Sequence, residues 1–231
     1  LVRRTVRMTR DEGTAFAALG DLIDAADVKR EGMVATSFDV ALSKFHRSHS
    51  NDSAYEHLVD LATALEATLT GGEKETEGLT LRLRTRAAAL LATDDDPATA
   101  LFDDVGQLYG LRSQLVHGGQ IKQKELRKSI GRISTVPSEA TEHRFGVALG
   151  HAVDRMRDLV RRSILARLCL AAEPDALWPF NGDTAVDAIL ADDAQRRAWR
   201  ARWHERLAAL GVEYAGGPPR SAVDFLSQED R

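Results

Sequence analysis

An arginine and a histidine at the end of one predicted helix are the residues of this chain best suited to chemistry. Arg112 and His117 lie five positions apart in the segment Leu-Tyr-Gly-Leu-Arg-Ser-Gln-Leu-Val-His-Gly-Gly, residues 108–119, whose two glycines predict a helix end. Arginine is a permanently charged, forked ligand for phosphate. Histidine accepts or donates a proton near neutral pH. The pair therefore suits a reaction at a phosphodiester.

The spacing of this pair is not specific by itself. Similar spacings occur at Arg144 with His151 and at Arg197 with His204. Only Arg112 and His117 combine the spacing with a glycine stop and a preceding Leu-Tyr-Gly-Leu-Arg-Ser run. The context, rather than the spacing, makes this pair the candidate catalytic pair.

Composition narrows the class of protein. The chain has 231 residues, of which 43% are hydrophobic and only six are proline, which is enough for a packed core and favours helix. The net charge of −4 argues against a basic nucleic-acid coat, so any RNA contact needs a local basic patch. Cys169 is the only cysteine, which excludes a disulfide framework and a cysteine zinc site and indicates a buried thiol. We expect no metal, no cofactor, no membrane association, and the cytoplasm as the compartment.

Hydrophobic periodicity and helix-start signals predict an all-α fold, a helical bundle with extra N- and C-terminal helices. The three predicted parts are a basic arm and helix (1–37), the bundle (38–172) and a C-terminal helical extension (173–231). The predicted helices cover residues 11–28, 53–70, 79–92, 94–117, 138–172, 183–190 and 192–210. Residues 38–46 are expected to be a lead-in to the core and residues 121–136 a basic connector. We expect a capping box from Ser53 with Glu56.

Several polar and aromatic features allow two interpretations. The run Asp94-Asp95-Asp96-Pro97 is better explained as a capped helix start than as a metal site. Trp199 and Trp203 share one helix face, which suits the core more than a partner surface. One face of the predicted helix 138–172 is either solvent-exposed or a phosphate-binding stripe, and it carries Arg144, Arg155, Arg157, Arg161, Arg162 and Arg167.

Three segments resemble the HEPN domains, and within them the Apea-like group, over about residues 45–170. The first is Leu-Val-Asp-Leu-Ala-Thr-Ala-Leu-Glu-Ala (58–67), with Glu66 in the family's acidic position. The second is Arg-Ala-Ala-Ala-Leu-Leu (86–91), similar to the family's second helix. The third is residues 108–118, which resemble the family's Tyr-x-x-Arg-Ser-x-hydrophobic-Val-His-Gly signature. The resemblance implies a helical bundle that pairs as a homodimer and, in many members, cuts RNA without metal.

By this resemblance, Arg112 and His117 of two chains would form one composite catalytic site. We expect Arg112 to bind phosphate and His117 to transfer protons. Ser113 would support them by a hydrogen bond to phosphate or to His117. Tyr109 would pack, or would stack on a base. Glu66 would hold Arg112 or Arg86 by an ion pair, or act directly. Arg86, Arg155 and Arg162 are the candidate RNA-binding residues. The family often has Asn, Asp or His where this chain has Ser113.

Three functions are therefore open at this point. The leading hypothesis is a metal-independent endoribonuclease, a toxin or defence effector, with RNA as its partner. The alternative is a non-catalytic HEPN module that dimerises and binds RNA or nucleotide within a larger protein. The third is a helical interaction domain with no ligand. The sequence begins at Leu1 rather than methionine, which leaves open an upstream domain or a regulatory partner.

Overall fold

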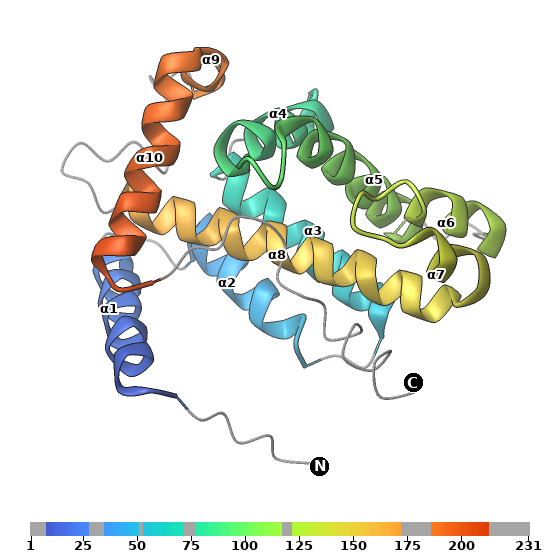
Figure 1. Cartoon of the computed structure of the whole chain (residues 1–231), viewed down its shortest axis with the longest axis horizontal. Helices are drawn as coiled ribbons and strands as arrows, with labels where there is room; N and C mark the ends of the chain where they lie inside the picture. The colour runs from blue at the N-terminus through green and yellow to red at the C-terminus, as the bar shows by residue number, and fades with distance from the viewer. Residues whose placement is uncertain are drawn as a thin grey trace.

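The chain folds into helices, as its composition predicts. The computed structural model describes residues 8–27, 35–50, 53–71, 77–116, 122–171 and 186–212, and in these ranges it contains ten helices and no strand (Figure 1). The helices are α1 (Arg10–Asp27), α2 (Ser37–Arg47), α3 (Ala54–Thr70), α4 (Leu79–Leu91), α5 (Ala98–Val116), α6 (Gln123–Ile130), α7 (Ser138–His143), α8 (Phe145–Ala171), α9 (Val186–Ala191) and α10 (Asp193–Ala209). The predicted all-α class is confirmed.

Helix α8 is the central element of the bundle. It contacts eight other helices, which are α1, α2, α3, α4, α5, α6, α7 and α10, and α10 crosses its C-terminal part (Figure 1). Its apolar stripe, which includes Ala152, Met156 and Leu159, is completely buried. Because neighbours surround α8 on several sides, its polar positions are also buried over much of its length.

Two predictions about helix boundaries are wrong. The predicted single helix 138–172 is divided into α7 and α8 at Arg144, whose backbone leaves the helical region with φ −129° and ψ 69°. The predicted capping box at Ser53 does not form, because Ser53 is the N-cap of α3 but its side chain makes no capping hydrogen bond. A capping box forms instead at the start of α2, between Thr36 and Asp39.

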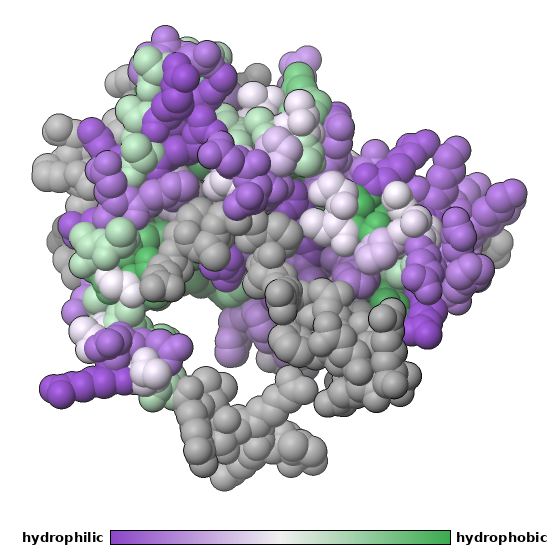
Figure 2. Space-filling model, viewed as in Figure 1, coloured by the Kyte–Doolittle hydropathy of each residue, from purple (hydrophilic) through white to green (hydrophobic). Residues whose placement is uncertain are grey.

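Two segments expected to be irregular are helical. The predicted lead-in 38–46 lies within α2, which is joined to α3 by ion pairs from Lys44 and Arg47 to Asp60, at 2.8 and 3.2 Å. The predicted connector 121–136 contains α6, which buries Leu126 and Ile130 and exposes its lysines. In both helices a narrow apolar face meets the bundle while the rest stays polar, as the hydrophilic surface around α6 in Figure 2 illustrates.

The C-terminal helix α10 joins the same hydrophobic core as the bundle. Trp199, Trp203 and Leu207 are buried in that core, so the interpretation of the two tryptophans as core residues is confirmed. The Trp203 indole donates a hydrogen bond to the Leu90 carbonyl at 3.2 Å, and Arg200 donates to the Ala92 carbonyl at 3.2 Å. These carbonyls end α4 and would otherwise lack a helical partner, so α10 both covers and caps α4.

The carbonyl groups at the C-terminal end of α3 are also capped by an arginine side chain from another helix. Arg167 of α8 donates to the Ala67 carbonyl at 2.8 Å, and its second terminal nitrogen donates to the Ser37 hydroxyl at 2.8 Å. Burial lowers the pKa of Arg167 to about 10. The negative charge of Asp39 acts in the opposite direction but offsets only part of this shift. Cys169, two residues before the end of α8, is buried as predicted.

Candidate functional site

The candidate site lies at the C-terminal end of α5. Arg112 and Ser113 occupy the last turns of this helix and are both half-buried. His117 follows the last residue of α5 directly, but it lies outside the described residues. The structure therefore defines the surroundings of Arg112 and leaves the predicted proton-transfer residue as a prediction from the sequence.

Tyr109 anchors this end of α5 to α3. Its side chain is only 8% exposed, and its hydroxyl donates a hydrogen bond to Glu66 Oε2 at 2.7 Å. Burial, followed by the hydrogen bond to Glu66 and the negative charge of Glu66, raises the pKa of Tyr109 to about 12, although the charge of Arg112 acts in the opposite direction. Tyr109 is therefore a neutral, packed phenol at pH 7 in this structure, and its ring is not free to stack on a base.

Arg112 lies beside this tyrosine and has no ion-pair partner among the residues that the structure describes. Its guanidinium carbon is 5.6 Å from the centre of the Tyr109 ring, a distance at which a cation and a ring attract each other. Its Nε is buried and makes no hydrogen bond, and no carboxylate of the described residues pairs with this side chain. Arg112 thus presents a positive charge that the part of the chain described here does not neutralise.

Glu66 has a different role from the predicted one. The expected ion pair with Arg112 or Arg86 does not form in the structure, because the Glu66 carboxylate accepts the Tyr109 hydroxyl instead. Glu66 therefore acts on Arg112 through Tyr109, whose ring lies between the two elements α3 and α5. Between the Ser113 side chain and the rest of the described residues no hydrogen bond is seen, and its predicted partner His117 lies outside them.

Arg86 is corrected from a candidate RNA-binding residue to a structural one. Its side chain is 2% exposed and donates two hydrogen bonds to Asp187, at 2.7 and 2.9 Å, and one to the Leu69 carbonyl at 2.9 Å. The hydrogen bond from Arg86 is the largest cause of the lowered pKa of Asp187. Arg86 therefore links α3, α4 and α9, and its charge is not available to an external phosphate.

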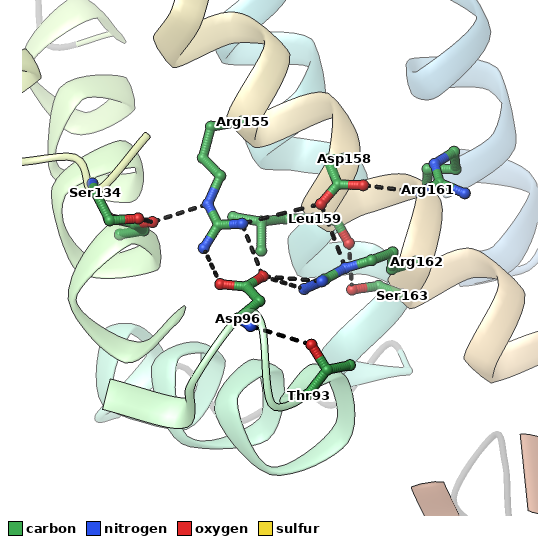
Figure 3. Close-up of polar contacts among 10 residues, drawn as sticks. Thr93, Asp96, Ser134, Arg155, Asp158, Leu159, Arg161, Arg162 and Ser163 are labelled. Atoms are coloured by element: carbon green, nitrogen blue, oxygen red, sulfur yellow. Dashed lines mark hydrogen bonds and ion pairs between the residues drawn. The ribbon is translucent and has the colours of Figure 1, made fainter. Parts of the chain in front are cut away.

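Arg155 and Arg162 are corrected in the same way. Both side chains are 0% exposed, and both bind Asp96, which lies between them (Figure 3). Arg155 makes two hydrogen bonds of 2.8 Å to Asp96, while Arg162 makes two to Asp96 Oδ2, at 2.9 and 2.8 Å. The predicted phosphate-binding stripe on α8 is therefore largely an internal ion-pair cluster.

Two further carboxylates complete this buried cluster. Asp104 of α5 accepts a bond from Arg155 at 2.8 Å and two bonds from Ser134, at 2.7 and 2.6 Å. Asp158 of α8 lies 3.4 Å from Arg162 and binds Arg161 at 2.8 Å. Burial alone would lower the pKa of Arg155, but its hydrogen bonds and attraction to Asp96 and Asp104 outweigh burial, so the net shift is upward.

The sequence contained a partial signal for this buried cluster. Asp158 stands three positions after Arg155 and four before Arg162, a spacing at which helical side chains of opposite charge meet. Of the three aspartates in the run 94–96, only Asp96 turns inward, and Asp94 and Asp95 are exposed. No group of metal-binding side chains was found among the described residues.

No family model, curated protein or solved structure matches this chain significantly. None of the helices in the described ranges has the length and apolar character needed to cross a bilayer. The features of this chain that indicate a function are therefore the geometry around Arg112 and the resemblance of the surrounding sequence to the HEPN signature.

Proposed function

We propose that this protein is a metal-independent endoribonuclease of HEPN type, with a composite site formed by Arg112 and His117 of two chains. The observation that supports the proposal is the state of Arg112. Arg86, Arg155 and Arg162 are held by carboxylates, whereas Arg112 is half-buried with no carboxylate partner among the described residues. An uncompensated guanidinium at a helix end is suited to bind a phosphate.

The proposed reaction uses the RNA's own 2′-hydroxyl as the nucleophile. A histidine removes the proton of this hydroxyl, the oxygen attacks the adjacent phosphorus, and a second histidine protonates the leaving 5′-oxygen. The products are a 2′,3′-cyclic phosphate and a free 5′-hydroxyl. The two Arg112 side chains of a dimer stabilise the charge on the phosphorane oxygens.

The Tyr109–Glu66 pair positions Arg112 and does not transfer protons in this scheme. The Tyr109 proton is committed to Glu66, and its pKa of about 12 is far above neutral. Histidine is the side-chain type that ordinarily exchanges a proton near pH 7, and His117 is the one histidine of the proposed site. Acid–base chemistry in this proposal therefore depends entirely on His117.

The test is a cleavage assay on mixed RNA with a chelator present. We expect metal-independent cutting that leaves 2′,3′-cyclic phosphate ends, and we expect His117→Ala and Arg112→Ala each to slow it by about 100- to 10,000-fold. His143→Ala and Arg132→Ala are matched controls, because both side chains are exposed and far from the site in the sequence. Full activity in His117→Ala would exclude the proposed site.

The alternative is a non-catalytic HEPN module that dimerises and binds RNA or nucleotide. It is favoured by the same Arg112 geometry, because an uncompensated cation binds phosphate whether or not a proton is transferred. Sedimentation analysis and an RNA-binding assay distinguish this module from the endoribonuclease. RNA binding that is lost in Arg112→Ala but unchanged in His117→Ala, with no RNA cleavage by these variants or by the wild-type protein, supports the module.

A further inference from the structure

A second feature, independent of the proposed nuclease site, lies on the opposite half of α5. A cavity of about 570 Å³ opens between α4, α5, α9 and α10. Its walls include Ala88, Ala89, Phe102, Leu190, Arg196 and Arg200. The volume is in the range of pockets that bind small organic molecules. Asp103, another lining residue, is nine positions before Arg112, or about 14 Å along the helix.

The floor of this cavity is apolar and built mainly from small side chains. Ala88 and Ala89 of α4 are 8% and 9% exposed, and Leu190 of α9 is 1% exposed. Phe102 of α5 forms part of the wall, and Arg84 lies over its ring with the guanidinium carbon 3.8 Å from the ring centre. The small alanine side chains on α4 leave room for the apolar body of a ligand.

The α10 wall of the cavity is positively charged. Arg196 and Arg200 are one helical turn apart, and Arg196 is paired with Asp193. Arg200 is half-buried and donates to the Ala92 carbonyl at 3.2 Å, but it has no carboxylate in ion-pair contact among the described residues. Burial, then the charges of Arg196 and Arg197, lower the pKa of Arg200.

The acidic residue on the facing wall does not neutralise Arg200. Asp103 of α5 is paired with Arg84 at 3.2 Å, so both charges of that pair are already satisfied. A ligand with a negative group at Arg200 would compensate a cation that the fold leaves next to two other arginines. The cavity therefore combines an apolar floor with an arginine, Arg200, that no carboxylate of the described residues contacts, although the charge of Asp193 attracts it from a distance.

We propose that this cavity is a binding site for a small organic anion with an apolar body. Its carboxylate or phosphate group binds Arg200 and Arg196, and its apolar body covers Ala88, Ala89 and Phe102. The helices α9 and α10 form one side of the site and α4 and α5 the other, so a bound ligand bridges the C-terminal helices and the bundle (Figure 1).

The test uses the full chain and the fluorescent anion anilinonaphthalene sulfonate as a probe. We expect the probe to bind at one site and to be displaced by decanoate or by adenosine monophosphate. The two competitors distinguish an aliphatic carboxylate from a nucleoside phosphate. Decanol lacks the charge and inorganic phosphate lacks the apolar body, so both should compete at least about tenfold less well. Failure of both decanoate and adenosine monophosphate to displace the probe would overturn the proposal.

Two variants test the site from its two sides. Arg200→Gln removes the charge but keeps an amide donor for the Ala92 carbonyl, and we expect it to weaken anion binding about tenfold. Thr85→Trp places a large ring at an exposed lining position of α4 and should block the cavity. Thr80→Trp is the matched control, because Thr80 is exposed on the same helix outside the cavity. Unchanged binding in both Arg200→Gln and Thr85→Trp would contradict the assignment.

Discussion

At the scale of single residues, the partner of each arginine determines whether its charge is available to bind a ligand. The arginines that bind Asp96 or Asp187 are committed to the fold, whereas Arg112 rests against the ring of Tyr109 with its Nε unpaired. Tyr109 is in turn held by Glu66 from α3. The position of Arg112 should therefore depend on the hydroxyl of a neighbouring tyrosine.

The Tyr109 hydroxyl should contribute to stability in a pH-dependent way. We expect Tyr109→Phe to lower the free energy of unfolding by about 1–2 kcal/mol at pH 8, because Glu66 loses its hydrogen-bond donor. The folded pKa of about 12 lies above the unfolded value of about 10. The contribution is therefore complete below pH 10 and disappears as the pH rises toward 12.

Urea unfolding at several pH values, followed by circular dichroism, measures this effect. Tyr55→Phe is the matched control, because Tyr55 is 41% exposed on α3. If the difference in the free energy of unfolding between wild type and Tyr109→Phe stays constant from pH 8 to pH 12, the Tyr109 hydroxyl is not bound to Glu66 as the structure shows.

At the scale of elements, a buried ion-pair cluster joins α5 and the turn before it to α8. Asp96 precedes α5 and binds Arg155 and Arg162 (Figure 3). Asp104, which lies within α5, also binds Arg155. Burying these charges is costly, and their mutual attraction offsets that cost only while every partner is present. The cluster therefore sets the orientation of α5, the helix that carries Arg112.

Removing one charge from this cluster should be strongly destabilising. We expect Asp96→Asn to lower the free energy of unfolding by about 3–5 kcal/mol, because two buried guanidinium groups lose their shared carboxylate. Asp94→Asn and Asp95→Asn are matched controls on exposed neighbours and should change stability by less than about 0.5 kcal/mol. Chemical denaturation measures the free energy of unfolding of all three variants. An equal loss of stability in Asp95→Asn and Asp96→Asn would argue against a buried cluster.

At the scale of the whole molecule, the predicted C-terminal extension is part of the bundle. Trp203 lies in the common core, Arg200 and Trp203 bind the end of α4, and Arg86 binds Asp187 of α9. The described helices on both sides of residues 172–185 therefore share one hydrophobic core. A single core is expected to unfold in one cooperative transition.

Truncation of Trp203 should test whether α10 and the bundle share one hydrophobic core. We expect Trp203→Ala to lower the free energy of unfolding by about 3–5 kcal/mol, while Trp203→Phe should have a smaller effect. Arg202→Ala, an exposed neighbour on α10, serves as the control. Thermal unfolding of Trp203→Ala should remain a single transition. A first transition that removes only α10 and leaves the bundle folded would show that the extension is independent.

The sequence by itself determined the helical class and most helix positions. Periodic apolar residues predicted α1, α3, α4, α5 and α10 to within a few residues, because burying one apolar face is the main requirement on such helices. The sequence also identified Arg112 and Tyr109 as candidate site residues. It did not predict the break at Arg144, because the backbone leaves the helical region at an arginine and the nearest glycine, Gly146, lies two residues further on, inside α8.

Only the tertiary structure decided which charges face inward. Periodicity assigns the polar face of a helix to solvent, and that rule holds when a single face is covered. Helix α8 is surrounded by other helices, so Arg155 and Arg162 are buried, and the aspartates that neutralise them come from distant positions such as Asp96. The pairings with Asp96 and Asp104 depend on the packing of elements in three dimensions, and only the spacing of Asp158 within α8 gave a local sign of the cluster.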